Sequence, residues 1–163
     1  MTLPDRAATP ALLQVDAIVS RLTGRPALAE VCRFLRHAFA HYPWVGIYRV
    51  EGSDLVLDAW DGAQATEHTR IPIARGICGQ AVRERRSVVV DDVRSDPNYL
   101  ACFLETRAEI VVPIVHNGAI VGEIDIDGNS VRTFDDSDRR FLEKVAAKLG
   151  AAVERSGAEL PVG

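Results

Sequence analysis

Residues 109–127 read EIVVPIVHNGAIVGEIDID, and this stretch decides the fold. Two apolar runs flank the pair Asn117-Gly118, and an Asn-Gly pair favours the type I′ turn of a two-residue β-hairpin. The sequence therefore predicts strands over 109–116 and 119–127 that pair antiparallel through this turn. The other elements can be placed outward from this hairpin.

The second run of the hairpin alternates strictly from Gly122 to Gly128. Strand periodicity places Glu123, Asp125 and Asp127 together on one face of the sheet. A solvent-facing sheet edge is the ordinary explanation for such a row. Inside a pocket the same row could bind an amino group, and mutual repulsion would raise one carboxyl pKa enough to give a proton donor. Glu109, at the start of the neighbouring strand, would extend this cluster.

The segments on either side of the hairpin alternate between helical and strand patterns. Helices are predicted at 11–22, 27–41 and 77–86, and a final helix is predicted from a cap at Thr133 or Asp135 onward. Further strands are predicted at 44–50, 55–60, 68–73 and 87–90. Helices at both ends of a mostly antiparallel set of strands predict an α+β domain whose helices pack on one face of the sheet.

The composition excludes several classes of function. A chain of 163 residues is long enough for one domain with a proper core. Its net charge of −4 leaves no basic patch for nucleic acid. It has no apolar run of about 20 residues that could span a membrane. Its N-terminus lacks the apolar core of a signal peptide, so we expect a cytoplasmic protein with reduced thiols.

Two of the three cysteines lie in contexts that suit thiol chemistry. Cys78 follows a strand and begins a helix, where unpaired N–H groups favour the thiolate. Cys102 lies in the long connection 92–107, and long loops inside compact domains are often functional. Burial as small core residues explains both cysteines equally well. Cys32 lies on the apolar stripe of a helix, which predicts core packing.

Two aromatic residues, Trp44 and Tyr48, lie four apart on one predicted strand and therefore on one face. They could form an apolar wall for a small ligand, and ordinary core packing is an equal alternative. His68 and His116 have no partners at metal-ligand spacing, and the chain has no Cys-x-x-Cys or glycine-rich phosphate loop. We therefore expect neither a metal nor a cofactor.

The closing hairpin, with Val112-Pro113-Ile114 followed by the run from Gly118 to Asp127, resembles that of a GAF domain. This resemblance implies a single domain with a central antiparallel sheet, helices packed on one face and a ligand pocket on the other. It covers roughly residues 25–155. We expect a helical extension over 1–24 and a disordered tail over 156–163.

Shorter motifs resemble one enzymatic branch of that family, the free methionine-(R)-sulfoxide reductases. These motifs are Trp44-Val45-Gly46-Ile47-Tyr48, Arg75 to Gly79, Ala101-Cys102, Ala108 to Pro113, and Asp125-Ile126-Asp127. The chain departs from the branch at His68, where many members carry a further cysteine. A disulfide relay through that position is not available here.

The resemblance implies that the chain reduces free methionine-(R)-sulfoxide. Cys102 would attack the sulfoxide sulfur and become a sulfenic acid, and Cys78 would resolve it to a disulfide that a thioredoxin-like reductant reopens. These two roles are reversible on the sequence alone. Trp44 and Tyr48 would enclose the methyl-sulfinyl end. The substrate ammonium would be bound by Glu109, Asp125 and Asp127, with Glu123 a weaker candidate.

A homodimer is a further expectation from the family. The competing interpretation is a non-catalytic GAF module that binds a small molecule in the same pocket and acts through a separate partner. The two interpretations predict different numbers of free thiols after methionine sulfoxide is added. Only the enzyme would lose two thiols to a disulfide.

Overall fold

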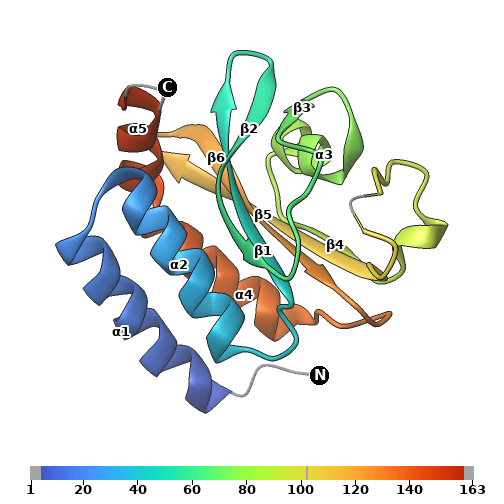
Figure 1. The fold of residues 1–163 in the computed structure, drawn as a ribbon, viewed down its shortest axis with the longest axis horizontal. Coiled ribbons are helices and arrows are strands. Elements are labelled where there is room, and N and C mark those ends of the chain that lie inside the picture. Colours follow the sequence, from blue (N-terminus) through green and yellow to red (C-terminus); the bar gives the residue numbers. More distant parts are fainter. Residues whose placement is uncertain (1–4, 102, 160–163) are drawn as a thin grey trace.

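The computed structural model of the protein describes residues 5–101 and 103–159. In these ranges, and in chain order, the elements are α1 (Asp5–Arg21), α2 (Gly24–Ala38), β1 (Trp44–Glu51), β2 (Asp54–Gly62), β3 (Arg70–Pro72), α3 (Gly76–Glu84), β4 (Val88–Val90), the 3-10 turn η1 (Val93–Ser95), β5 (Ala108–His116), β6 (Ala119–Gly128), α4 (Asp136–Ala146) and α5 (Gly150–Ala158). The strands form one antiparallel sheet in the order β3-β2-β1-β6-β5-β4. Figure 1 shows this sheet between a layer of helices and, on the other side, the short helix α3 with its loops. The predicted α+β class is confirmed.

The predicted hairpin is β5–β6. Its turn residues Asn117 and Gly118 have φ values of 51° and 81°, the left-handed values that a type I′ turn requires. The two strands pair from Ala108 opposite Gly128 to His116 opposite Ala119. The register shifts once, between Ile114 and Val115, so the turn and this irregularity together set which residues of β6 face each side of the sheet.

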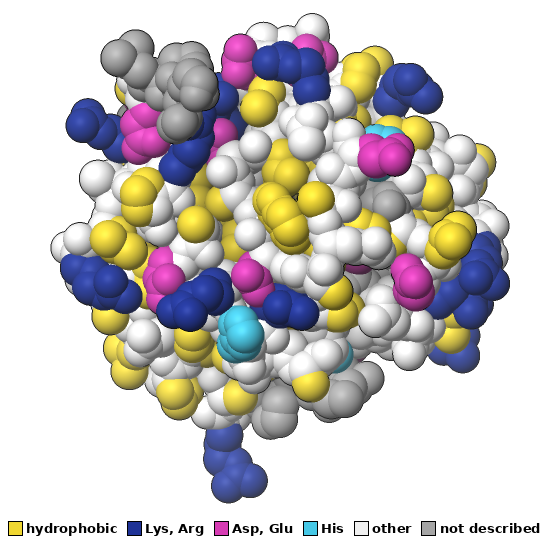
Figure 2. All heavy atoms as spheres, viewed as in Figure 1, with side chains coloured by type: hydrophobic (Ala, Val, Ile, Leu, Met, Phe, Trp, Pro, Cys, Tyr) yellow, Lys and Arg dark blue, Asp and Glu magenta, His cyan; other side chains and the backbone are white. Residues whose placement is uncertain are grey.

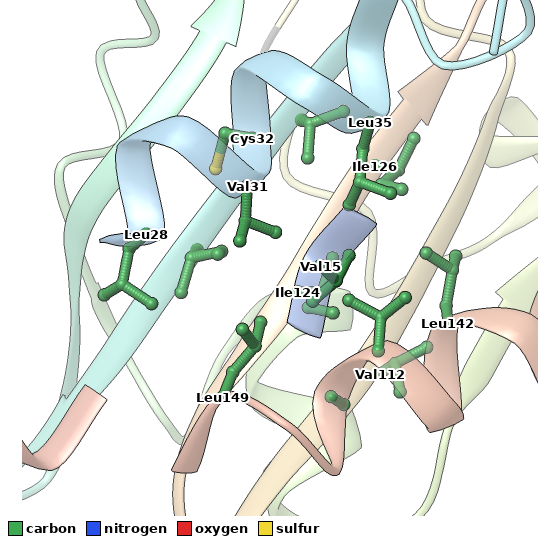
Figure 3. Close-up of a cluster of buried hydrophobic side chains, with 14 of the residues drawn as sticks. Val15, Leu28, Val31, Cys32, Leu35, Val112, Ile124, Ile126, Leu142 and Leu149 are labelled. Atoms are coloured by element: carbon green, nitrogen blue, oxygen red, sulfur yellow. The ribbon is translucent and has the colours of Figure 1, made fainter. Parts of the chain in front are cut away.

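One face of the sheet carries the main apolar core. Ile124 and Ile126 of β6 are fully buried there, in a core that α2, α4 and α5 also line, and Figure 3 shows them among side chains that include residues of α2 and α4. Helix α1 packs on α2 and α4 rather than on the sheet, which adds an outer layer. Cys32 is fully buried in this core, and burial raises the pKa of its thiol. The prediction that Cys32 serves core packing is confirmed.

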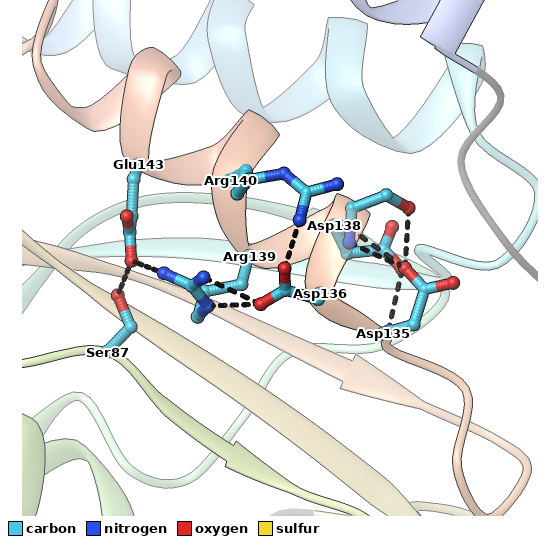
Figure 4. Close-up of polar contacts among 8 residues, drawn as sticks. Ser87, Asp135, Asp136, Asp138, Arg139, Arg140 and Glu143 are labelled. Carbon is cyan, nitrogen blue, oxygen red and sulfur yellow. Dashed lines mark hydrogen bonds and ion pairs between the residues drawn. The ribbon is translucent and has the colours of Figure 1, made fainter.

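Helix α4 begins with a reciprocal cap, shown in Figure 4. The Asp135 carboxylate accepts the backbone N–H of Asp138, and the Asp138 carboxylate accepts that of Asp135. The other oxygen of Asp138 accepts the hydroxyl of Tyr42 at 2.6 Å and lies 2.8 Å from His41 Nε2. Asp138 therefore joins the start of α4 to the segment before β1, and the predicted cap at Asp135 is confirmed.

The single final helix of the prediction is two helices, α4 and α5, separated by a turn at 147–149. Gly150 begins α5 where the backbone approaches β5 so closely that a Cβ atom would lie 2.8 Å from that of His116. The chain turns at this contact and continues across the end of the sheet. Helix α5 reaches Ala158, so the first three residues of the predicted tail are helical, and the buried Ser156 hydroxyl donates to Val153 O.

The surface carries charges of both signs. On the face in Figure 2, the visible described Lys and Arg side chains alternate with Asp and Glu and form no continuous basic surface. In the ranges 5–101 and 103–159, no helix combines the length and the apolar character needed to cross a bilayer.

Candidate functional site

The strand register brings the predicted site residues onto one face of the sheet. Trp44 of β1 lies opposite Asp127 of β6, and Tyr48 lies opposite Glu123. Glu109 of β5 lies opposite Asp127 from the other side. Directly opposed residues of an antiparallel pair share a face. The aromatic and acidic residues therefore lie together on the face that α3 covers.

Four buried carboxylates form what we call the acid cluster. Its members have exposed fractions of 3% (Glu109), 0% (Glu123), 1% (Asp125) and 2% (Asp127). The explanation of the row as a solvent-facing edge is wrong, because β6 lies between β1 and β5 in the middle of the sheet. Among the described residues, no hydrogen-bond partner meets either oxygen of Glu123 or Asp127, or Oδ1 of Asp125. Such oxygens require protons or a donating ligand.

Burial changes the protonation of this cluster. Burial raises the pKa of Glu123 and of Asp127 well above the usual carboxyl range, and the charge of Asp125 adds to both shifts. Burial also raises the pKa of Asp125 to about 6, although contacts with Glu109 and Cys78 and the charge of His68 oppose this shift. These shifts favour the protonated carboxyl groups, which can donate a proton to a bound ligand.

Cys78 lies at the start of α3, 6% exposed, and faces the acid cluster. Burial raises the pKa of its thiol well above the usual value, and the charges of Asp125, Glu123 and Glu109 raise it further. Burial and these carboxylates therefore oppose the Cys78 thiolate that the helix N-terminus was expected to favour. Sequence reasoning saw the helix start but not the carboxylates, which β5 and β6 bring from more than 30 residues away.

Cys102 lies outside the described residues. The residues on either side of it are described and lie at the site. The Ala101 carbonyl oxygen is 3.0 Å from His68 Nε2. The Phe103 ring packs against Trp44 with centroids 5.7 Å apart. Ala101 and Phe103 thus each contact a residue of the site, His68 and Trp44 respectively.

Two hollows open beside the acid cluster. The larger, of about 210 Å³, is lined by Trp44, Phe103 and Asp127 together with polar groups such as Thr106 and Asn129. The smaller, of about 10 Å³, has room for about one water molecule. It is lined by Ile71, Gly76, Ile77, Cys78, Leu100 and Glu109. Phe103, Thr106 and Asn129 were missed by sequence reasoning, because only tertiary contact brings them to the site.

Trp44 forms one wall of the larger hollow. A Cβ atom on Gly46 would lie 2.5 Å from Trp44 Cη2, and one on Gly62 would lie 2.2 Å from Trp44 Cδ1. The indole thus lies across two glycines on neighbouring strands. It also stacks on Trp60, with centroids 6.2 Å apart and planes 13° apart, and its Nε1 donates to Gln64 O.

Tyr48 has a different position from Trp44. It lines neither hollow and is fully buried in the apolar cluster that contains Cys78. Its hydroxyl donates to the carbonyl oxygen of His68 at 2.8 Å. Tyr48 therefore anchors the backbone of segment 66–69 through this hydrogen bond.

Three potential metal ligands also meet in this site. One ligand atom each of Cys78, Glu109 and Asp125 lies within 4.8 Å of the others. A thiolate with two carboxylates is a donor set that suits Zn²⁺. The expectation of no metal rested on local spacing, and such spacing does not address ligands from three separate elements.

The fold and this site together define an α+β domain with a buried acidic and thiol-bearing pocket for a small molecule. The profile of the GAF domain family matches residues 24–154. The chain belongs to the GAF domain family, which confirms the single GAF domain expected from the sequence.

Individual relatives are similar over most of the chain. GAF domain-containing protein A of Dictyostelium discoideum is 35% identical over 140 residues, covering 85% of this chain and 87% of that protein. The free methionine-R-sulfoxide reductase of Escherichia coli is 34% identical over 122 residues, covering 75% of this chain and 73% of that protein. The X-ray structure of free methionine-R-sulfoxide reductase from Neisseria meningitidis in complex with its substrate shows 35% identity and a TM-score of 0.85, covering 96% of this chain and 95% of that chain. The resemblance to the reductase branch is confirmed.

Proposed function

We propose that this chain is an enzyme that reduces free methionine-(R)-sulfoxide to methionine. The observation that carries the proposal is the acid cluster, in which Glu123, Asp125 and Asp127 have buried oxygens without hydrogen-bond partners among the described residues. The Cys78 thiol lies within 4.8 Å of ligand atoms of Glu109 and Asp125. Two similar proteins, from E. coli and N. meningitidis, are named for this activity. The chemistry needs a thiol, a proton donor and a partner for an ammonium group, and the pocket face offers all three.

Substrate recognition follows from the charge of the cluster. Glu109, Asp125 and Asp127 would accept hydrogen bonds from the free ammonium, which a methionine inside a peptide lacks. Glu123 lies deeper and would keep its proton. Trp44 would enclose the methyl-sulfinyl end, with Tyr48 supporting that side of the pocket from behind.

The first chemical step transfers one oxygen atom. The Cys102 thiolate attacks the sulfoxide sulfur while a protonated carboxyl of the cluster gives its proton to the sulfoxide oxygen. The sulfur–oxygen bond of the substrate breaks, methionine leaves, and the oxygen stays on Cys102 as a sulfenic acid. The substrate sulfur is reduced by two electrons and the cysteine sulfur is oxidised by two.

The second step closes a disulfide. The carboxylate that lost its proton is then a base for the Cys78 thiol, which attacks the Cys102 sulfur and releases the oxygen as water. A dithiol protein of the thioredoxin kind would reopen the disulfide and become a disulfide itself. This reductant, a cytoplasmic location and a homodimer are parts of the same proposal.

The test is release of methionine from free L-methionine-(R)-sulfoxide with dithiothreitol as reductant. Turnover should vanish in Cys102→Ser and persist in Cys32→Ala, a matched variant of a cysteine that lies in the core. Wild-type protein should lose two thiols when it meets substrate without reductant. Folded, reduced protein that neither turns over nor loses thiols would contradict the proposal and favour the non-catalytic binding module.

A further inference from the structure

His68 lies where the acid cluster meets the loop that carries Cys102. Its backbone is fixed on both sides: Tyr48 donates to its carbonyl oxygen at 2.8 Å, and its N–H donates to Thr66 Oγ1 at 3.0 Å. The next residue, Thr69, accepts a hydrogen bond from the backbone N–H of Leu57 on β2. The imidazole therefore extends from an anchored segment.

The His68 ring reaches the opposite loop. Its Nε2 lies 3.0 Å from the carbonyl oxygen of Ala101, 33 residues away in the chain. A carbonyl oxygen only accepts hydrogen bonds, so Nε2 must carry the proton and donate. Ala101 directly precedes Cys102, so this bond holds the backbone one residue from the proposed attacking thiol.

The same ring also acts on the acid cluster. Its charge lowers the pKa of Asp125, which burial raises. His68 acts on Asp125 at a distance through charge, whereas Glu109 and Cys78 act through side-chain hydrogen bonds. The imidazole is thus close to both the carboxylates and the loop.

We propose that His68 is a positioning residue, whose Nε2–H bond holds the backbone of Ala101, the residue before Cys102, beside the acid cluster. For catalysis this inference rests on the function proposed above, but the bond itself can be tested without turnover. No covalent step involves the imidazole. Its role toward Cys102 would depend only on the geometry of the loop, apart from its charge effect on Asp125.

Two substitutions separate the bond from the rest of the side chain. In His68→Gln the amide nitrogen can occupy the place of Nε2 and donate to Ala101. In His68→Asn the amide nitrogen occupies the place of Nδ1 and falls short. His37→Asn is the matched control, because His37 is an exposed histidine of α2 that pairs with Asp61.

The first readout is amide hydrogen exchange of a peptide covering 97–106. Exchange should be about fivefold faster in His68→Asn, the factor that one net hydrogen bond is worth, and should match the wild type in His68→Gln and His37→Asn. The second readout is kcat/KM for free methionine-(R)-sulfoxide, which should fall by a similar factor in His68→Asn and recover in His68→Gln.

The outcomes separate the two proposals. Wild-type exchange in His68→Asn, or equally fast exchange in His68→Gln, would overturn the positioning role while leaving the reductase intact. The expected exchange pattern in a wild-type protein that shows no turnover would support the bond and overturn the proposed function.

Discussion

Asp125→Asn should make the protein more stable at neutral pH while it damages the site. Asp125 has a pKa of about 6 in the folded protein because of burial, against about 3.9 in an unfolded chain. The folded state therefore binds a proton that the unfolded state has released. Stability falls as pH rises from about 4 through about 6, and then stays constant.

The magnitude follows from the difference of about two pKa units. This difference costs the folded state about 3 kcal/mol at pH 7.5 and about 1 kcal/mol at pH 4.5. Asparagine has nearly the same shape and no charge, so Asp125→Asn should recover most of this free energy. Urea unfolding of ligand-free protein at both pH values measures it. Loss of the carboxylate should also lower kcat/KM about 100-fold or more, since an ammonium partner is removed.

Asp58→Asn is the matched control. Asp58 is also a buried aspartate, but it pairs with Arg49 at 3.1 Å and with Arg25 at 3.6 Å. The same substitution should destabilise the protein there, because it removes a buried carboxylate that is already paired with two arginines. The reasoning is refuted if Asp125→Asn destabilises like Asp58→Asn, or if its gain in stability is the same at pH 4.5 and pH 7.5.

Three further predictions test other parts of the structure. Asp138→Ala removes the carboxylate that accepts hydrogen bonds from the Tyr42 hydroxyl and from the backbone N–H of Asp135 at the start of α4. It should lower the free energy of unfolding by about 3 kcal/mol, measured in urea titrations. Gly118→Ala meets no atom within 4 Å, so its cost should be backbone strain alone, about 1 kcal/mol by thermal unfolding, and a neutral result would contradict the turn assignment. Cys78→Ser should stop the reaction at the sulfenic acid, which dimedone labels and mass spectrometry detects; a disulfide in this variant would exclude Cys78 as the resolving thiol.

The parts of the fold that depend on local chemistry were predictable. The Asn117-Gly118 turn needs only two residues in a left-handed conformation, and the alternation after it places Glu123, Asp125 and Asp127 on one face. Whether that face is exposed to solvent or buried depends on β1, which pairs with β6 although more than 70 residues separate them in the chain. No local pattern contains that information, so the sequence left a sheet edge and a pocket as alternatives.

The sequence predicts which residues form the site better than it predicts their protonation and their contacts. Proximity in the sequence to a helix start suggested a thiolate at Cys78, but carboxylates from distant strands reverse the expected direction of its pKa shift. His68 was considered only as a metal ligand or as a replaced cysteine. Its contact with Ala101, 33 residues away, depends on tertiary structure, and no local period or motif indicates it.

The placement of Trp44 across Gly46 and Gly62 makes three residues on two strands interdependent. Each glycine can gain a side chain only if the indole moves, and an indole that moves changes the width of the larger hollow. Alanine at either glycine should therefore be harmful alone and tolerated with a smaller residue at position 44. This wall of the pocket has to be redesigned by coordinated substitutions, and libraries that vary one position at a time would miss the viable combinations.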